Sequence, residues 1–170
     1  AADMLLDFQI TADGGYLLTG LSGSPANGDK MTPNYGSLDY WLVKIDANGI
    51  IQWDQTFGGT GNDQCRTLMA TSDGGFLLGG FSDSPISGNK TDVNYGSLDY
   101  WVIKTDNNGV KIWDRSIGGS EAEDLKSLGE SSKGIYLIGG NSASNISGTR
   151  TQASRGGRDY YLSFLDSDGN

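Results

Sequence analysis

The chain has 170 residues and a net charge of −9, with 27 glycines, three prolines, one cysteine and no histidine. An acidic chain argues against nucleic acid as a partner, because phosphate binding needs clustered Lys and Arg. The absence of histidine excludes Ser-His triads and the commonest zinc ligand. No apolar run approaches the roughly 18 residues that a membrane-spanning segment needs.

Cys65 is the single cysteine, so an internal disulfide and a thiolate metal cluster are both excluded. It lies in an alternating run after a turn. Free cysteine is among the most buried residue types. The sequence therefore predicts a buried structural thiol.

A tandem repeat of 60 residues runs through the chain. Segments 11–58 and 71–118 align without a gap and share 27 of 48 residues. A third copy from Ser131 keeps the same offset, since Asp159-Tyr160 matches Asp99-Tyr100. A regular period of this length is typical of a solenoid, a propeller or a similar array.

Each repeat contains up to four strand candidates. A hairpin turn, with a Gly-Gly pair in the first two repeats, joins the first and second strands, and a polar loop of about 16 residues joins the second and third. The second strand carries an apolar Leu-Leu-x-Gly run that is expected to be covered on both faces. The predicted strands are 5–11, 16–22, 40–45 and 50–57, then 66–71, 76–82, 100–105 and 110–117, then 125–130, 136–142 and 160–165.

Four antiparallel strands connected as a meander describe a β-propeller blade, so the predicted fold class is all-β. The alternative is a β-trefoil, which also has three four-stranded repeats. Blade 1 is expected at about 1–58, blade 2 at about 59–118, and blade 3 at about 119–170 without its fourth strand. Since propellers have about four to eight blades, we expect further blades of a longer chain, or other copies of this one, as partners.

The turn at 46–49 followed by Trp53, copied at 106–109 and Trp113, resembles the turn-and-tryptophan signature of quinoprotein-type propeller blades. That resemblance implies that the Trp docks between adjacent blades. The fuller pattern adds Thr-x-Asp-Gly-Gly, Ser-Gly-x-Lys-Thr and Asp-Tyr-Trp-x-x-Lys. It resembles the tandem propeller-like repeats of secreted and cell-surface proteins of Bacteroidota, many of which carry a type IX secretion sorting domain. The third repeat departs from it at Lys133, Ile135 and Tyr161.

Two sets of residues could be read as ligand sites or as structure. The Asp-x-Asn/Asp-Gly turns resemble fragments of a calcium loop, but calcium needs about six to eight oxygens, and a hairpin turn capped by its Asp is the favoured interpretation. Recurring Trp41, Trp53, Trp101 and Trp113 could stack on sugars, but they favour packing between blades. The calcium candidates are Asp46, Asn48, Asp106, Asn108, Asp166 and Asp168.

The long loop between the second and third strands is the predicted recognition site, because loops of successive propeller blades converge on one face. Cations, Tyr and Asp alternate there and could bind a glycan or an acidic polymer; alternatively, Lys and Asp pair across the loop. The ligand-binding candidates are Lys30, Asn34, Tyr35, Lys90, Asn94, Tyr95, Arg150 and Arg155.

The repeat also bears on function. A catalytic centre needs unlike residues that converge on one point, whereas the notable residues here recur in every repeat. Carboxylates for glycoside hydrolysis remain an alternative, at Asp63, Glu121, Glu123 and Asp124. We therefore expect a non-enzymatic propeller segment of a secreted or surface protein, with scaffold or adhesion role and no cofactor. The alternatives are a lectin that uses the loops and a polysaccharide-active enzyme.

Overall fold

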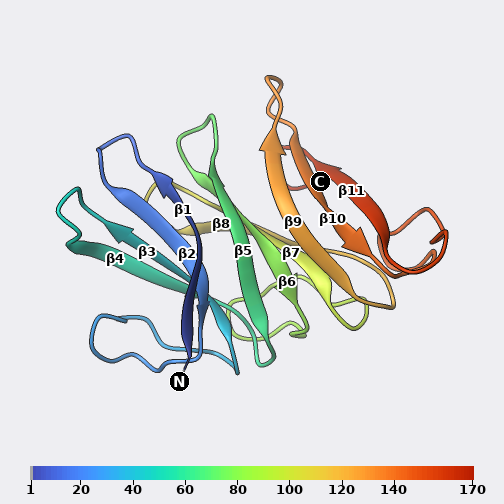
Figure 1. Ribbon diagram of the computed structural model, residues 1–170, viewed down its shortest axis with the longest axis horizontal. Coiled ribbons are helices and arrows are strands. Elements are labelled where there is room, and N and C mark those ends of the chain that lie inside the picture. Colours follow the sequence, from blue (N-terminus) through green and yellow to red (C-terminus); the bar gives the residue numbers. More distant parts are fainter. Residues whose placement is uncertain (1) are drawn as a thin grey trace.

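A computed structural model describes residues 2–170, in which eleven strands form three separate antiparallel sheets. The three sheets lie side by side, in the order of the three repeats (Figure 1). The strands are β1 (Asp3–Ile10), β2 (Tyr16–Ser22), β3 (Asp39–Ile45), β4 (Ile51–Phe57), β5 (Asp63–Ala70), β6 (Phe76–Ser82), β7 (Asp99–Thr105), β8 (Lys111–Ile117), β9 (Glu123–Glu130), β10 (Tyr136–Ser142) and β11 (Asp159–Leu165).

Within each sheet the strands follow chain order, as in a propeller blade. Blade 1 has the order β1-β2-β3-β4 and blade 2 the order β5-β6-β7-β8, while β9-β10-β11 form blade 3. The all-β meander predicted from the sequence is therefore confirmed. The β-trefoil alternative is wrong, because the sheets do not join into a common barrel. Among residues 2–170, no helix is long and apolar enough to cross a membrane.

The second strand of each blade has the bounds that the sequence predicts and the third begins one residue earlier, but the first strand begins two or three residues earlier than predicted. β5 begins at Asp63 and β9 at Glu123, and both side chains are fully buried. In the sequence these acidic residues stand at the end of a polar segment, so the predicted strands begin after them. They pair instead with Ser82 and Ser142, at the far ends of β6 and β10.

Adjacent blades are joined by a tyrosine from one blade that reaches a glycine in the next. The Tyr40 hydroxyl donates to the Trp101 carbonyl oxygen at 2.9 Å, and a Cβ at Gly80 would lie 2.7 Å from that hydroxyl. Tyr100 repeats the contact one blade later, donating to the Tyr161 carbonyl oxygen at 3.3 Å beside Gly140. Glycine is thus needed at these positions to admit the tyrosine.

The outermost tryptophans also dock onto the next blade, as the sequence predicts. A Cβ at Gly109 would lie 2.6 Å from the Trp53 ring, and one at Gly169 would lie 2.9 Å from the Trp113 ring. Gly109 has a φ of 76°, which the tight turn requires and which disfavours larger residues. The turn-and-tryptophan pattern is therefore a contact between blades.

The apolar core consists of two clusters, one at each junction between blades. The first includes Leu17 and Tyr40 of blade 1 with Cys65 and Leu78 of blade 2. The second includes Leu77 and Tyr100 of blade 2 with Leu125 and Ile138 of blade 3. Cys65 is fully buried, as predicted, and burial raises its pKa to about 12. Blade 2 therefore contributes to both clusters and each outer blade to one.

Candidate functional site at the loops and blade junctions

The recurring loop cations lie beneath the loops, not on their surface. Lys30, Lys90 and Arg150 are each at most 5% exposed. The Lys90 ammonium donates to the Asp92 carbonyl oxygen at 2.7 Å and to Ser116 Oγ at 2.6 Å, and it lies 5.6 Å from the centre of the Trp101 ring. Lys30 makes the equivalent bonds in blade 1. Burial lowers the pKa of both lysines. Their cations hold the loop to its own sheet, and a ligand in solvent does not reach them.

A second anchor of the loop is the aspartate that follows the outermost tryptophan. The Asp114 carboxylate accepts Trp101 Nε1 at 2.9 Å, the Thr91 hydroxyl, and Lys111 Nζ at 2.6 Å. Burial tends to raise the pKa of Asp114, but these hydrogen bonds hold it down at about 2. Asp54 accepts the same kinds of donor in blade 1, from Trp41 and Thr32. This hub fixes the loop onto the third and fourth strands.

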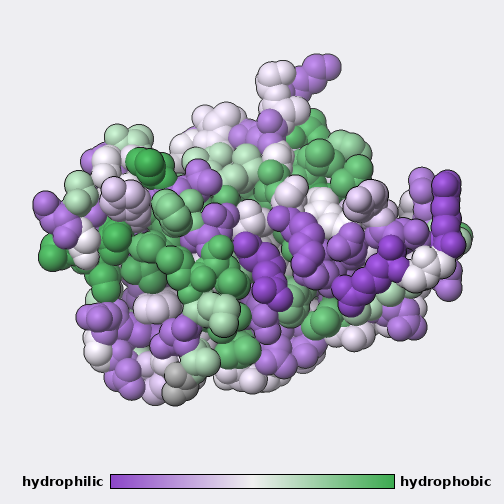
Figure 2. All heavy atoms as spheres, in the orientation of Figure 1, coloured by the Kyte–Doolittle hydropathy of each residue, from purple (hydrophilic) through white to green (hydrophobic). Residues whose placement is uncertain are grey.

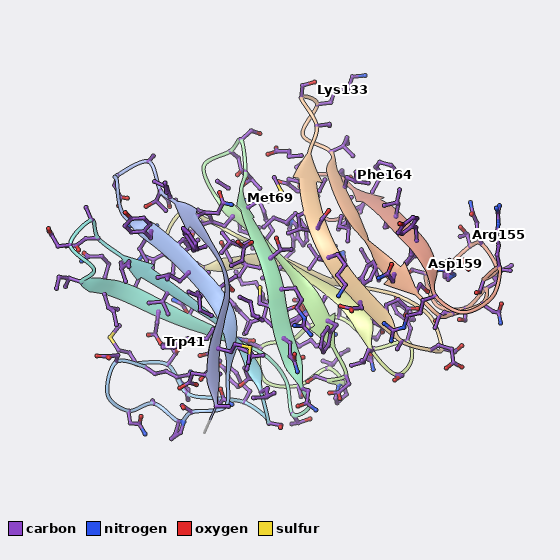
Figure 3. All side chains as sticks on the ribbon, viewed as in Figure 1. Trp41, Met69, Lys133, Arg155, Asp159 and Phe164 are labelled. Carbon is purple, nitrogen blue, oxygen red and sulfur yellow. The ribbon has the colours of Figure 1, made fainter. Side chains whose placement is uncertain are left out.

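Tyr35, Tyr95 and Arg155 remain at the surface, but the two tyrosines also serve the junctions. A Cβ at Gly88 in blade 2 would lie 2.9 Å from the Tyr35 side chain, and one at Gly148 would lie 2.9 Å from Tyr95. Each tyrosine thus packs on the loop of the next blade while staying about two-fifths exposed, at 40% and 39%. Arg155 lies on the far loop of blade 3 (Figure 3).

Asn34 and Asn94 shape the ends of their loops. The Asn34 side-chain amide donates to the Gly36 carbonyl oxygen at 3.2 Å, and that of Asn94 donates to the Gly96 carbonyl oxygen at 2.8 Å. Both side chains are half-buried. The structure therefore spreads the eight predicted ligand-binding residues over three loops, with their cations turned inward, and does not gather them into one pocket.

Buried carboxylates meet at each junction, a feature that the sequence analysis did not identify. Asp39 ends the long loop of blade 1, and Asp63 begins blade 2; both are fully buried. Asp63 accepts the Gly59 N–H and the Ser84 hydroxyl, each at 2.8 Å. Burial raises the pKa of Asp39 to about 6, and the negative charge of Asp63 adds to that rise.

Asp99 and Glu123 form the corresponding pair at the next junction. Glu123 accepts the Gly119 N–H at 2.9 Å and the Ser142 hydroxyl at 2.5 Å. Burial first, and then the neighbouring Glu123, raise the pKa of Asp99 to about 7. Two neighbouring carboxyl groups, one of them with a raised pKa, resemble a general acid–base pair. However, all four side chains have no exposed surface that a substrate could contact.

The candidate calcium turns use their aspartates as backbone caps. Asp46 Oδ1 accepts the N–H groups of Asn48 at 2.8 Å and Ile50 at 2.9 Å. Asp106 and Asp166 accept the corresponding pairs of N–H groups. Across residues 2–170, no group of three or more His, Cys, Asp or Glu side chains could hold a metal ion. The carboxylates of these turns are thus engaged by the turn itself.

No protein-family model matches the chain. A curated relative, "Regulatory protein FlaEY" of Caulobacter vibrioides, is 28% identical over 172 residues that cover 98% of this chain. The chain spans 17% of that relative's length. The similarity therefore extends over all three blades, and the rest of that protein has no counterpart in these 170 residues.

Proposed function

We propose that the chain is a non-enzymatic set of β-propeller blades that acts as a scaffold or adhesive part of a secreted or surface protein. The observation that carries the proposal is the fate of the recurring polar side chains. Lys90, Asp114 and Glu123 are buried, and each is occupied by bonds that hold a loop or a junction in place. The polar groups of these three side chains are therefore engaged in holding the fold and are not free to act on a substrate.

The arrangement of the acidic pairs also supports a structural role. Glycoside hydrolysis needs two carboxyl groups on either side of a bond in an open cleft. Asp99 and Glu123 are instead enclosed between blades, and Asp39 and Asp63 repeat the arrangement at the other junction. A pair that occurs at each junction matches a device for joining blades.

A lectin is the second candidate, favoured by one specific observation. Tyr35 and Tyr95 present partly exposed rings at equivalent places on successive loops, and exposed aromatic rings can stack on sugars. Their packing against Gly88 and Gly148 would fix the orientation of both rings. The name of the Caulobacter relative adds a regulatory role to the possibilities, which a scaffold could fill by binding other proteins.

Turnover and glycan binding separate these functions. The scaffold proposal predicts no hydrolysis of any polysaccharide in a broad panel by the chain or by its Glu123→Gln variant. Hydrolysis by the parent chain that a folded Glu123→Gln variant lacks would overturn it. Glycan-array binding that Tyr35→Ala and Tyr95→Ala together abolish, with the fold unchanged by circular dichroism, would replace the scaffold by the lectin.

A further inference from the structure

Two sheet faces are apolar and open to solvent: the face of blade 1 and the face of blade 3 that point away from blade 2. On the face of blade 3, Tyr160 is 92% exposed, Leu162 58% and Phe164 65%. On the face of blade 1, Leu5 is 57% exposed and Phe8 55%. Hydrophobic atoms gather over the sheet of blade 1 in Figure 2. Contiguous apolar surface of this kind usually marks a contact with another protein.

Every one of these residues except Phe164 has a buried apolar counterpart at a junction inside the chain. Tyr160 and Leu162 correspond, sixty residues earlier, to Tyr100 and Val102, which pack against blade 3. Leu5 and Phe8 correspond to Cys65 and Leu68, which pack against blade 1. The blade 3 face therefore carries the residues that, at the internal junctions, pack against the first strand of the next blade. The blade 1 face carries the residues that pack against the blade before it.

Blade 1 already has the groove that would receive the tyrosine of such a junction. A groove of about 300 Å³ lies on blade 1, lined by Leu18, Gly20 and Trp41. Gly20 corresponds to Gly80 and Gly140, beside which the hydroxyls of Tyr40 and Tyr100 lie. Tyr160 is the equivalent tyrosine of blade 3, with its side chain in solvent.

The polar half of the junction is formed in the same way. Asp3 accepts the Ser22 hydroxyl at 2.6 Å, as Glu123 accepts that of Ser142. Asp159 accepts the Arg155 N–H at 2.6 Å, as Asp39 accepts that of Tyr35. Arg155 and Asp159 lie at the open end of blade 3 (Figure 3). Both partners of an acidic pair are thus in position before they meet.

Phe164 makes the blade 3 face more apolar than its counterparts. The earlier repeats carry Lys44 and Lys104 here, paired with Asp13 at 2.8 Å and Asp73 at 3.0 Å. The third repeat has Phe164, and Lys133 at the position of the paired aspartate. Both changes remove the ion pair, and the exposed phenyl ring adds apolar area.

We propose that the blade 3 face of one copy docks head to tail on the blade 1 face of a second copy, with Tyr160 beside Gly20. Two copies bring six blades, within the range of about four to eight in which propellers close, so the pair forms a ring with two such junctions. A head-to-tail contact forms a closed ring when its rotation permits. The inference rests on the proposed propeller segment and names a second copy as its partner.

Light scattering during gel filtration of the 170-residue chain tests this. We expect a mass that rises, as loading approaches about 100 µM, towards twice the 18.0 kDa of one chain, since interfaces of ordinary size bind at micromolar strength or tighter. Leu162→Asp blocks one face and Phe8→Asp the other, and since both positions are exposed we expect both variants to fold. Each variant alone is expected to be monomeric.

Mixing the two variants is the discriminating step. Each supplies the face that the other lacks, so the mixture is expected to form a one-to-one complex that is weaker than the parent pair, because only one of the two junctions forms. Ile112→Asp, at an exposed position on β8 outside both faces, is the control and should leave the pair intact.

A parent chain that stays monomeric at about 100 µM would overturn the inference, as would a mixture that stays monomeric while both variants are folded by circular dichroism. Self-association that only one of the two variants abolishes would point to a face pairing with itself, and would equally overturn it. None of these outcomes involves turnover, so they are separate from a failure of the scaffold proposal.

Discussion

Blade 2 and blade 3 share key residues of the repeat but have very different surroundings. Tyr100 is fully buried and hydrogen bonded to blade 3, whereas Tyr160, its copy, is almost fully exposed. Trp101 is fully buried in the middle blade, while its copy in blade 1, Trp41, is half-buried. The same residue type at the same place in a blade is core or surface according to whether another blade covers it.

That difference indicates that the apolar residues of the repeat stabilise the contacts between blades more than they stabilise a single blade. A blade has few apolar side chains that it can bury within one sheet, so its stability comes from its neighbours, as in other repeat architectures. Blade 2 has two neighbours within residues 2–170, and blades 1 and 3 have one each (Figure 1). Substitutions at equivalent positions should therefore have unequal effects.

The largest difference in the loss of stability is expected between two equivalent tryptophans, Trp101 and Trp41. Trp101→Ala should lower the free energy of unfolding by about 3–5 kcal/mol, because it empties a filled junction and removes a donor to Asp114. Trp41→Ala, with the same bond to Asp54 but a ring that is only partly buried, should lower it by about 1–2 kcal/mol. Urea unfolding of both variants, monitored by circular dichroism, measures the difference; equal losses would contradict the comparison.

The acidic pair at the second junction should show itself in the pH dependence of stability. The pKa of Asp99 is about 7 in the folded chain and near 3.8 when unfolded. Between these values the folded chain holds the extra proton, so stability is highest at the acid end of that window and falls as pH rises towards 7. Asp99→Asn should remove a fall of about 2 kcal/mol between pH 5 and 8.

Asp159→Asn is the matched control for that variant. Hydrogen bonds from Arg155 and Ser154 lower the pKa of Asp159, so its contribution is present above pH 4 and is lost only on further acidification. The control should therefore keep the fall that Asp99→Asn removes, measured by urea titrations at four pH values. A fall that persists unchanged in Asp99→Asn would show that the buried pair does not hold the proton.

The smallest effect is expected for one hydroxyl. Tyr100→Phe should cost about 1 kcal/mol, because its hydroxyl bonds to two carbonyl oxygens of blade 3. Tyr160→Phe should change the stability of the monomer by less than the error of the measurement, since that hydroxyl lies in solvent. Thermal unfolding at low protein concentration makes this comparison, and a loss of equal size at both positions would count against it.

The sequence predicted the sheets well because the fold depends on local signals. The glycine turns and the apolar runs after them place β2, β6 and β10 at their observed bounds. The burial of Lys90 could not be predicted in this way, since lysine is usually exposed and only the folded loop shows its acceptors. The pairing of Asp99 with Glu123 is likewise a contact between blades, which no single repeat encodes.

Hydrogen–deuterium exchange, resolved to individual strands, tests the account most directly. The Leu162→Asp variant is expected to be monomeric, so that only the junctions within the chain protect its backbone. We predict that β6 and β7, with a blade on each side, exchange most slowly, and that β1 and β11, at the two open faces, exchange much faster. Equal protection of all eleven strands would contradict the claim that junctions between blades stabilise this protein.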